Sequence, residues 1–140
     1  MMAPASEAEL AALVADHHGR AAPLWLAGGG TRLRLPQAAT LSTRALSGVV
    51  AYEPGELTLI ARAGTPLAEI EALLASQGQA LAFEPMDHRA LLGTTGAPTI
   101  GGVVAANVSG PRRVLAGACR DHLLGVRFVD GRGRVIRNGG

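Results

Sequence analysis

Residues 24–33 read Leu24-Trp25-Leu26-Ala27-Gly28-Gly29-Gly30-Thr31-Arg32-Leu33. An apolar run that ends in three glycines predicts a buried strand over 23–27 that leads into a glycine-rich loop. Glycines let such a loop turn tightly and approach a ligand closely. Its successive N–H groups can form a nest for a phosphate, and a plain glycine turn is the alternative. The loop is not a dinucleotide-binding Gly-x-Gly-x-x-Gly fingerprint, because Leu33 stands where the third glycine belongs.

A second glycine segment follows about 70 residues later. It reads Thr99-Ile100-Gly101-Gly102-Val103-Val104-Ala105-Ala106-Asn107-Val108-Ser109-Gly110. We expect a short helix over 102–107 whose first N–H groups lack partners and suit an anion. The small side chains of Ala105 and Ala106, with Gly110, leave room for a planar ligand. The alternative is tight helix packing through small residues.

Together the two segments fit a ligand with a diphosphate in its middle. The amides of 28–32 and 101–103 would hold that diphosphate, assisted by Arg32. A hydrogen bond to a charged group contributes about 1.5–3 kcal/mol. Four or five of them would supply most of the roughly 8–12 kcal/mol of a micromolar to nanomolar complex. This interpretation requires the two segments to lie side by side.

The flanking sequence predicts an α+β pattern. A capping box of Ser6 and Glu9 predicts a helix over 7–18, with Gly19 as its left-handed end. A second helix is expected from Thr65 as N-cap and Pro66 as first residue to Gly78. Strands are expected around Leu41 and over 49–53, 57–61, 80–83, 123–130 and 135–138, with turns at 54–55 and 130–133. Residues 84–111 are expected to be largely irregular.

Composition excludes several classes of function. All 13 basic residues are arginines, so neither a P-loop nor a lysine Schiff base is possible. Four aromatic residues are too few for a base-stacking platform, so we expect no nucleic acid partner. Residues 90–111 carry no charge, but their glycines and Pro98 argue against a transmembrane helix. The N-terminus lacks the pattern of a secretory signal, which predicts a cytoplasmic protein.

The charge distribution and the cysteine content restrict the possible ligands and sites further. Residues 112–140 hold seven arginines against Asp121 and Asp130, a net charge of +5 that suits an anionic ligand or a partner chain. Cys119 is the single cysteine, which rules out an intrachain disulfide. Cys119 and His122 have metal-ligand spacing without a third ligand, so we expect no metal. His88 beside Asp87 is a candidate acid–base pair, or simply a polar loop tip.

These motifs resemble the FAD-binding domain of the p-cresol methylhydroxylase (vanillyl-alcohol oxidase) type, over nearly the full chain. The resemblance rests on 28–32, 63–70, 83–85, 99–102, 117–121 and 124–126. Within that superfamily, 52–57, 109–113 and 131–133 resemble the FAD-binding subunits of bacterial glycolate oxidases.

The resemblance implies a two-subdomain FAD-binding domain, with a first subdomain over 1–83 and the start of a second over 84–140. It implies that FAD lies between a parallel and an antiparallel subdomain. The activity would be that of an FAD-dependent 2-hydroxy-acid dehydrogenase or oxidase subunit that converts glycolate to glyoxylate and passes electrons to an acceptor. The partners would be a second flavoprotein subunit and an iron–sulfur subunit, and through them the protein would lie at the inner membrane as a peripheral component. The implied cofactor residues are Gly28, Gly29, Gly30, Thr31, Arg32, Pro85, Thr99, Ile100, Gly101, Gly102, Ala105, Ala106, Asn107, Gly110, Arg112, Gly117, Arg120 and Asp121.

The sequence departs from the family pattern at two places, and these concern how FAD is bound and how long the protein is. Members with covalent FAD commonly carry histidine where this chain has Thr31, so FAD should be non-covalent. The chain stops at Gly140 where relatives continue, so we expect a longer protein whose C-terminal part completes the flavin site. No residue stands out as the catalytic base.

Several alternatives stay open. Arg112 and Arg113 would pair with a substrate carboxylate or a FAD phosphate, or else be solvated or lie at a subunit face. Arg120 and Asp121 are alternatively a structural ion pair. The chain as a whole could be a non-catalytic assembly module, or a sister flavoenzyme acting on lactate or a sugar acid.

Overall fold

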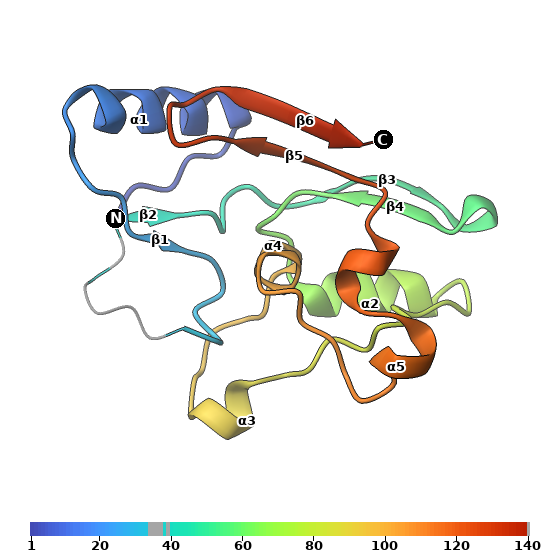
Figure 1. Cartoon of the computed structure of the whole chain (residues 1–140). Helices are drawn as coiled ribbons and strands as arrows, with labels where there is room; N and C mark the ends of the chain where they lie inside the picture. Colours follow the sequence, from blue (N-terminus) through green and yellow to red (C-terminus); the bar gives the residue numbers. More distant parts are fainter. Residues whose placement is uncertain (34–37, 39, 140) are drawn as a thin grey trace.

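The computed structural model describes residues 1–33, 38 and 40–139, which form helices and two-stranded sheets (Figure 1). The elements in chain order are α1 (Glu7–Gly19), β1 (Leu26–Ala27), β2 (Leu41–Ser42), β3 (Val49–Glu53), the 3-10 helix η1 (Pro54–Glu56), β4 (Thr58–Ala61), α2 (Leu67–Ala75), α3 (Arg89–Leu92), α4 (Ile100–Ala105), α5 (Arg113–Ala116), the 3-10 helix η2 (Cys119–His122), β5 (Gly125–Val129) and β6 (Val135–Gly139). The α+β class expected from the sequence is confirmed.

Helix α1 begins where the capping motif predicts. The Ser6 hydroxyl accepts a hydrogen bond from the Glu9 amide at 3.2 Å, and the Glu9 carboxylate accepts one from the Ala5 amide at 2.8 Å. The expected left-handed end at Gly19 is wrong. Gly19 is the last helical residue, and Ala21 takes the left-handed conformation with φ 52°.

The sheets are small. Strands β1 and β2 pair in parallel, and Met2 extends this sheet by a bridge to Leu41. The predicted buried strand over 23–27 shrinks to β1, whose Leu26 is 55% exposed. Strands β3 and β4 form an antiparallel hairpin joined through η1, as the turn at 54–55 predicts.

Helix α2 starts later than its sequence indicates. Thr65 is not the N-cap, because its hydroxyl donates to the carbonyl oxygen of Arg62 at 2.7 Å and accepts from the Gly48 amide at 2.9 Å. Pro66 takes the cap position, and Gly78 ends the following turn with φ 66°.

The predicted strand over 80–83 is absent. The chain turns there, with the Glu84 amide donating to the carbonyl oxygen of Leu81 at 3.1 Å. Phe83 enters the core because of this turn. The predicted helix over 102–107 exists as α4, which begins two residues earlier at Ile100.

The main core joins segments that are distant in sequence. It contains Leu67 of α2, Phe83, Val103 of α4, Val108 and Cys119 of η2. Val103 is fully buried and Cys119 is 1% exposed. The core therefore fixes α4 between α2 and η2.

The hairpin of β5 and β6 lies beside α1 (Figure 1). Its register pairs Phe128 with Ile136, and the predicted turn forms around Asp130. Arg127 of β5 forms a two-bonded ion pair with Glu7 of α1, which lowers the pKa of Glu7 by hydrogen bonding. The proposed division into subdomains near residue 83 stays a prediction. Among the described residues, no helix is both long and apolar enough to cross a membrane.

Candidate functional site

The two glycine segments lie side by side. A Cβ atom on Gly29 would stand 1.9 Å from the carbonyl oxygen of Ala97, and one on Gly96 would stand 1.8 Å from the carbonyl oxygen of Gly29. The Thr94 hydroxyl donates to the carbonyl oxygen of Thr31 at 2.9 Å. This backbone-to-backbone packing requires glycine at both contact positions.

The next residues continue the contact. A Cβ atom on Gly28 would lie 3.3 Å from the Thr99 hydroxyl, and one on Gly102 would lie 3.2 Å from a terminal nitrogen of Arg32. The first loop, Gly28 to Arg32, thus adjoins the start of α4. This proximity is what the diphosphate interpretation requires, and the role of these residues toward a ligand stays a prediction.

The two segments differ in their free donors. The amides of residues 28–32 donate no hydrogen bond to any residue that the structure describes. Gly30 has φ 72°, a conformation that favours glycine. The first loop therefore presents a run of available N–H groups, which suits an anion.

The expectation of free amides at the start of α4 is wrong. The Ile100 and Gly101 amides donate to the carbonyl oxygens of Thr65 and Ala63, at 3.0 and 2.8 Å. The Gly102 amide donates to the Thr99 hydroxyl at 3.3 Å, and the Val103 amide donates to the Thr99 carbonyl oxygen at 3.1 Å. These donors are occupied, so the 99–102 segment supports the first loop and lacks free amides of its own.

Arg32, the last residue of the first loop, forms no ion pair with any residue that the structure describes. Its Nε atom is enclosed and has no hydrogen-bond partner within the described part of the chain. Burial lowers the pKa of Arg32, and the charge of Asp87 opposes that shift. Asp87 itself is paired with Arg89 at 2.7 Å, and this pairing, with a smaller contribution from Arg32, lowers the pKa of Asp87 to about 2. Arg32 is thus left with a buried donor that an anionic ligand would satisfy.

Arg44 contacts the first loop, and sequence reasoning missed this contact. Its Nε donates to the carbonyl oxygen of Gly28 at 3.0 Å, and a terminal nitrogen donates to that of Gly29 at 2.7 Å. An isolated arginine in a loop carries no motif, so no local signal marked it.

The later predicted residues form a separate network around η2. The Asn107 side chain accepts from the Arg120 amide at 2.9 Å, and Asp121 accepts from the Ala118 amide at 2.7 Å. Arg120 lies 3.9 Å from Asp121, the distance of a loose ion pair. Asn107 and Asp121 therefore hold the backbone at the start of η2, and a contact of these three residues with the cofactor stays a prediction.

The remaining predicted residues are spread around this network. Gly110 packs closely on Glu84, because a Cβ atom there would lie 2.4 Å from its carbonyl oxygen. Arg112 pairs with Glu84 at 3.2 Å. Ala105 and Ala106 are exposed, and Gly117 has φ 88°. None of these placements tests a contact with a cofactor.

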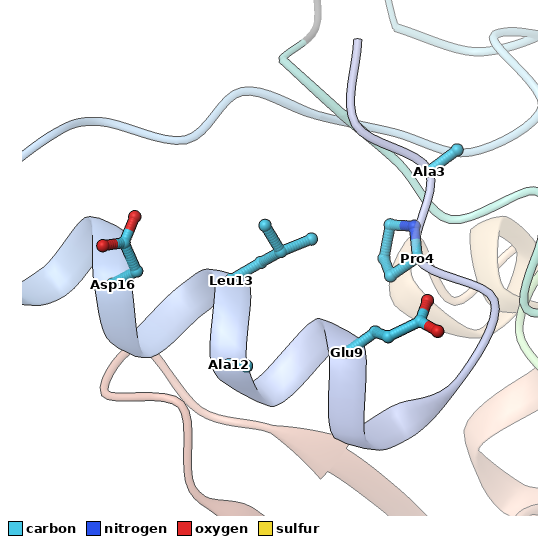
Figure 2. A pocket seen from close by; sticks show the side chains of 6 residues that line it. All are labelled: Ala3, Pro4, Glu9, Ala12, Leu13 and Asp16. Carbon is cyan, nitrogen blue, oxygen red and sulfur yellow. The ribbon is translucent and has the colours of Figure 1, made fainter.

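Two surface pockets lie away from the glycine loop. One lies between α1 and the residues before it, lined by Ala3, Pro4, Glu9, Ala12, Leu13 and Asp16 (Figure 2). Its two carboxylates disfavour an anion. Pro85 lines the other, together with residues of α2 and the Gln79–Glu84 segment.

No cluster of three or more potential metal ligands occurs among the residues with described positions. Cys119 is buried, and burial raises the pKa of its thiol. The thiol is therefore a core group in this fold.

Within the described residues, the α+β frame thus carries a glycine loop whose amides have no acceptor and an arginine whose Nε is enclosed and unpartnered, features that suit a phosphate-bearing ligand. Residues 1–139 match the family described as "FAD binding domain", so the chain belongs to this family and FAD is its cofactor. Over 101 residues the chain is 45% identical to glycolate oxidase subunit GlcE of Escherichia coli (strain K12). That alignment covers 72% of this chain and 27% of the relative, so the chain spans about a quarter of the relative's length.

Solved structures share the fold. A structure of alkyldihydroxyacetonephosphate synthase matches 97% of the chain with a TM-score of 0.74 and 24% identity, over 27% of its own length. A chitooligosaccharide oxidase matches 98% of the chain with a TM-score of 0.75 and 19% identity, over 28% of its length. These likenesses place the fold in the class expected from the sequence.

The residues present fit FAD. Its diphosphate is an anion that requires N–H donors and positive charge, and the first loop with Arg32 offers both. The unpartnered Nε of Arg32 is the strongest single indication, since a buried donor without an acceptor is rare in native folds.

Proposed function

We propose that this protein is the FAD-binding part of an oxidoreductase that oxidises a small 2-hydroxy acid, glycolate, to glyoxylate. The 45% identity to a glycolate oxidase subunit supports this substrate class. When bound, FAD would supply the two-electron chemistry, and the protein would bind and orient it. The electrons would pass to an acceptor through a second flavoprotein subunit and an iron–sulfur subunit. Those partners would also bring the protein to the membrane as a peripheral component.

The first loop would hold the diphosphate. The amides of Gly29 and Gly30 would donate to phosphate oxygens, and Arg32 would balance their charge. The observation that carries this assignment is the buried, unpaired Nε of Arg32 next to a loop of free amides. Thr99 would pack against Gly28 and Gly102 against Arg32, and these contacts would support the loop.

The flavin would be held without a covalent bond. Thr31, which stands where members with covalent FAD commonly carry histidine, is 4% exposed and offers only a hydroxyl. The one cysteine, Cys119, is 1% exposed and lies in the core. Acid precipitation should therefore release the flavin into the supernatant.

A titration tests the binding proposal. Purified protein is titrated with FAD, and binding is followed by quenching of flavin fluorescence. Arg32→Gln should weaken binding by roughly 10-fold or more, since it removes a charged hydrogen bond. Arg62→Gln is the matched control, because Arg62 is an exposed arginine that follows β4 and lies outside the first loop. Equal affinity of the Arg32 variant and the wild type would contradict the assignment.

A second candidate function is that of a non-catalytic assembly module. Val114 and Leu115 of α5 are 95% and 88% exposed and lie next to Arg112 and Arg113. Exposed apolar side chains rimmed by charge are typical of a docking surface. Protein that binds a partner subunit but neither retains nor takes up FAD would favour this function. Turnover assays of the assembled complex with glycolate, lactate and sugar acids would separate the substrate classes.

A further inference from the structure

Arg44 lies behind the first glycine loop. It follows β2, and its guanidinium donates to two consecutive carbonyl oxygens, those of Gly28 and Gly29, at 3.0 and 2.7 Å. The planar fork of arginine suits two acceptors that are held in fixed positions. Two adjacent peptide planes of the loop are therefore fixed by one side chain.

The orientation of those planes has a consequence for the amides. In a trans peptide the carbonyl and the following N–H point in opposite directions. Arg44 holds the carbonyls of Gly28 and Gly29 on its own side, so the amides of Gly29 and Gly30 point away from it. These are two of the amides that lack a partner in the described structure.

The backbone of Arg44 is itself held in place. The Thr43 amide donates to the carbonyl oxygen of Ala27 at 2.9 Å, and the Arg44 amide donates to the Ser42 hydroxyl at 3.3 Å. A Cβ atom on Gly64 would lie 2.7 Å from the Arg44 carbonyl oxygen. The guanidinium is confined as well, since a Cβ atom on Gly96 would lie 3.2 Å from it.

The charge of Arg44 is not neutralised nearby. No carboxylate of the described residues lies within ion-pair distance of its guanidinium. Arg44 thus bonds to the carbonyls of the loop, and a second arginine, Arg32, is the last residue of the loop itself. Both raise the positive potential at the place where the amides converge.

We propose that Arg44 is a positioning residue for the FAD diphosphate: it fixes the peptide planes of Gly28 and Gly29 so that the amides of Gly29 and Gly30 are oriented before the cofactor binds. The inference rests on the proposed function of the first loop. Orienting the donors in advance removes an ordering cost from binding. Arg44 acts through the backbone and needs no contact with FAD.

The test compares Arg44→Ala, Arg44→Lys and the control Arg62→Ala by calorimetric titration with FAD and with ADP, which shares the diphosphate. Arg44→Ala should weaken both ligands by roughly 10- to 100-fold. Arg44→Lys keeps the positive charge, but its single ammonium group cannot bond to both carbonyl oxygens as the guanidinium does. Its affinity for FAD should therefore lie between those of Arg44→Ala and the wild type. Arg62→Ala should bind as the wild type does. The melting temperature of each protein without ligand separates lost binding from lost folding.

A purely structural role for Arg44 would lower the melting temperature and leave the FAD affinity of the folded protein within twofold of the wild type, which would overturn the proposal. If Arg44→Ala does not fold, Arg44→Lys decides: weaker FAD binding at an unchanged melting temperature supports the proposal, and unchanged binding overturns it. Wild-type protein that binds neither ligand would overturn the proposed function instead. In that event the ¹⁵N heteronuclear NOE of Gly29 and Gly30 still tests Arg44, because it should fall in Arg44→Ala only if this side chain orders the loop.

Discussion

Gly29 and Gly96 contact each other through their backbones, with the Gly96 Cα facing the carbonyl oxygen of Gly29 so closely that a Cβ atom would stand 1.8 Å from it. A glycine pair that packs in this way joins two segments without any side chain. The contact brings the unpaired donors of the first loop to the support formed by residues 94–102.

Substitution of either glycine should destabilise this contact. Gly96→Ala or Gly29→Ala places a methyl group against a backbone carbonyl, and overpacking of this kind costs about 1–3 kcal/mol of the free energy of unfolding. Gly55→Ala is the control, since a Cβ atom there has no neighbour within 4 Å. Urea denaturation measures the difference. Equal midpoints for all three variants would show that the two segments do not pack as described.

Asp87 should oppose cofactor binding. Its carboxylate interacts with the charge of Arg32, although Arg89 is its main partner. Asp87→Asn removes an exposed negative charge that interacts with Arg32, and the effect of such a charge is small because solvent screens it. FAD affinity should therefore rise by up to about fivefold at low salt, with a smaller gain at high salt because of screening. An affinity that falls in Asp87→Asn would place the diphosphate elsewhere.

The buried hydroxyl of Thr65 should matter more than its methyl group. Thr65 is fully buried and links Gly48 to Arg62 through its Oγ1. Thr65→Val leaves the Gly48 amide without this acceptor, a loss of about 1–3 kcal/mol in the free energy of unfolding. Thr65→Ser keeps the hydroxyl and should retain most of the stability, as followed by thermal denaturation. The reverse order of the two variants would contradict the hydrogen-bonding role.

The turn between β5 and β6 should weaken in acid. Asp130 accepts bonds from the backbone amides of Arg132 and Arg134 and from the Arg134 side chain, which together lower its pKa to about 2. A lowered pKa in the folded state means that the stabilisation is present above the ordinary value of 3.8 and is lost as the pH falls toward 2. Carboxyl NMR titration measures this pKa directly. The stability of Asp130→Asn should depend less on pH in the same interval.

Local sequence signals predicted the elements that use local contacts. The Ser6 and Glu9 capping pair and the hairpin turn at Asp130 depend on residues within four positions of each other, and both formed where expected. The proximity of the glycine segments was also anticipated, because an extended anionic ligand needs both.

Most of the errors came from contacts between residues that are distant in the sequence. The amides of Ile100 and Gly101 are occupied by acceptors at Thr65 and Ala63, more than 30 residues away. The hydroxyl of Thr65 is hydrogen-bonded to Gly48 and Arg62, so the prediction that Thr65 is the N-cap of α2 is wrong. Arg44 could not be identified because its acceptors are backbone carbonyl oxygens, those of Gly28 and Gly29. Every residue has such an oxygen, so the sequence carries no signal for the contact.

The hydrogen bond from Thr94 to Thr31 spans 63 positions in the chain. During synthesis the first loop leaves the ribosome long before its support exists, and closing such a distance is slow compared with forming a helix. The backbone N–H groups of the nascent loop therefore remain solvated until the segment around Thr94 has been synthesised and can pack against the loop. A nascent chain that ends before residue 94 therefore has the first loop but lacks the segment that packs against it.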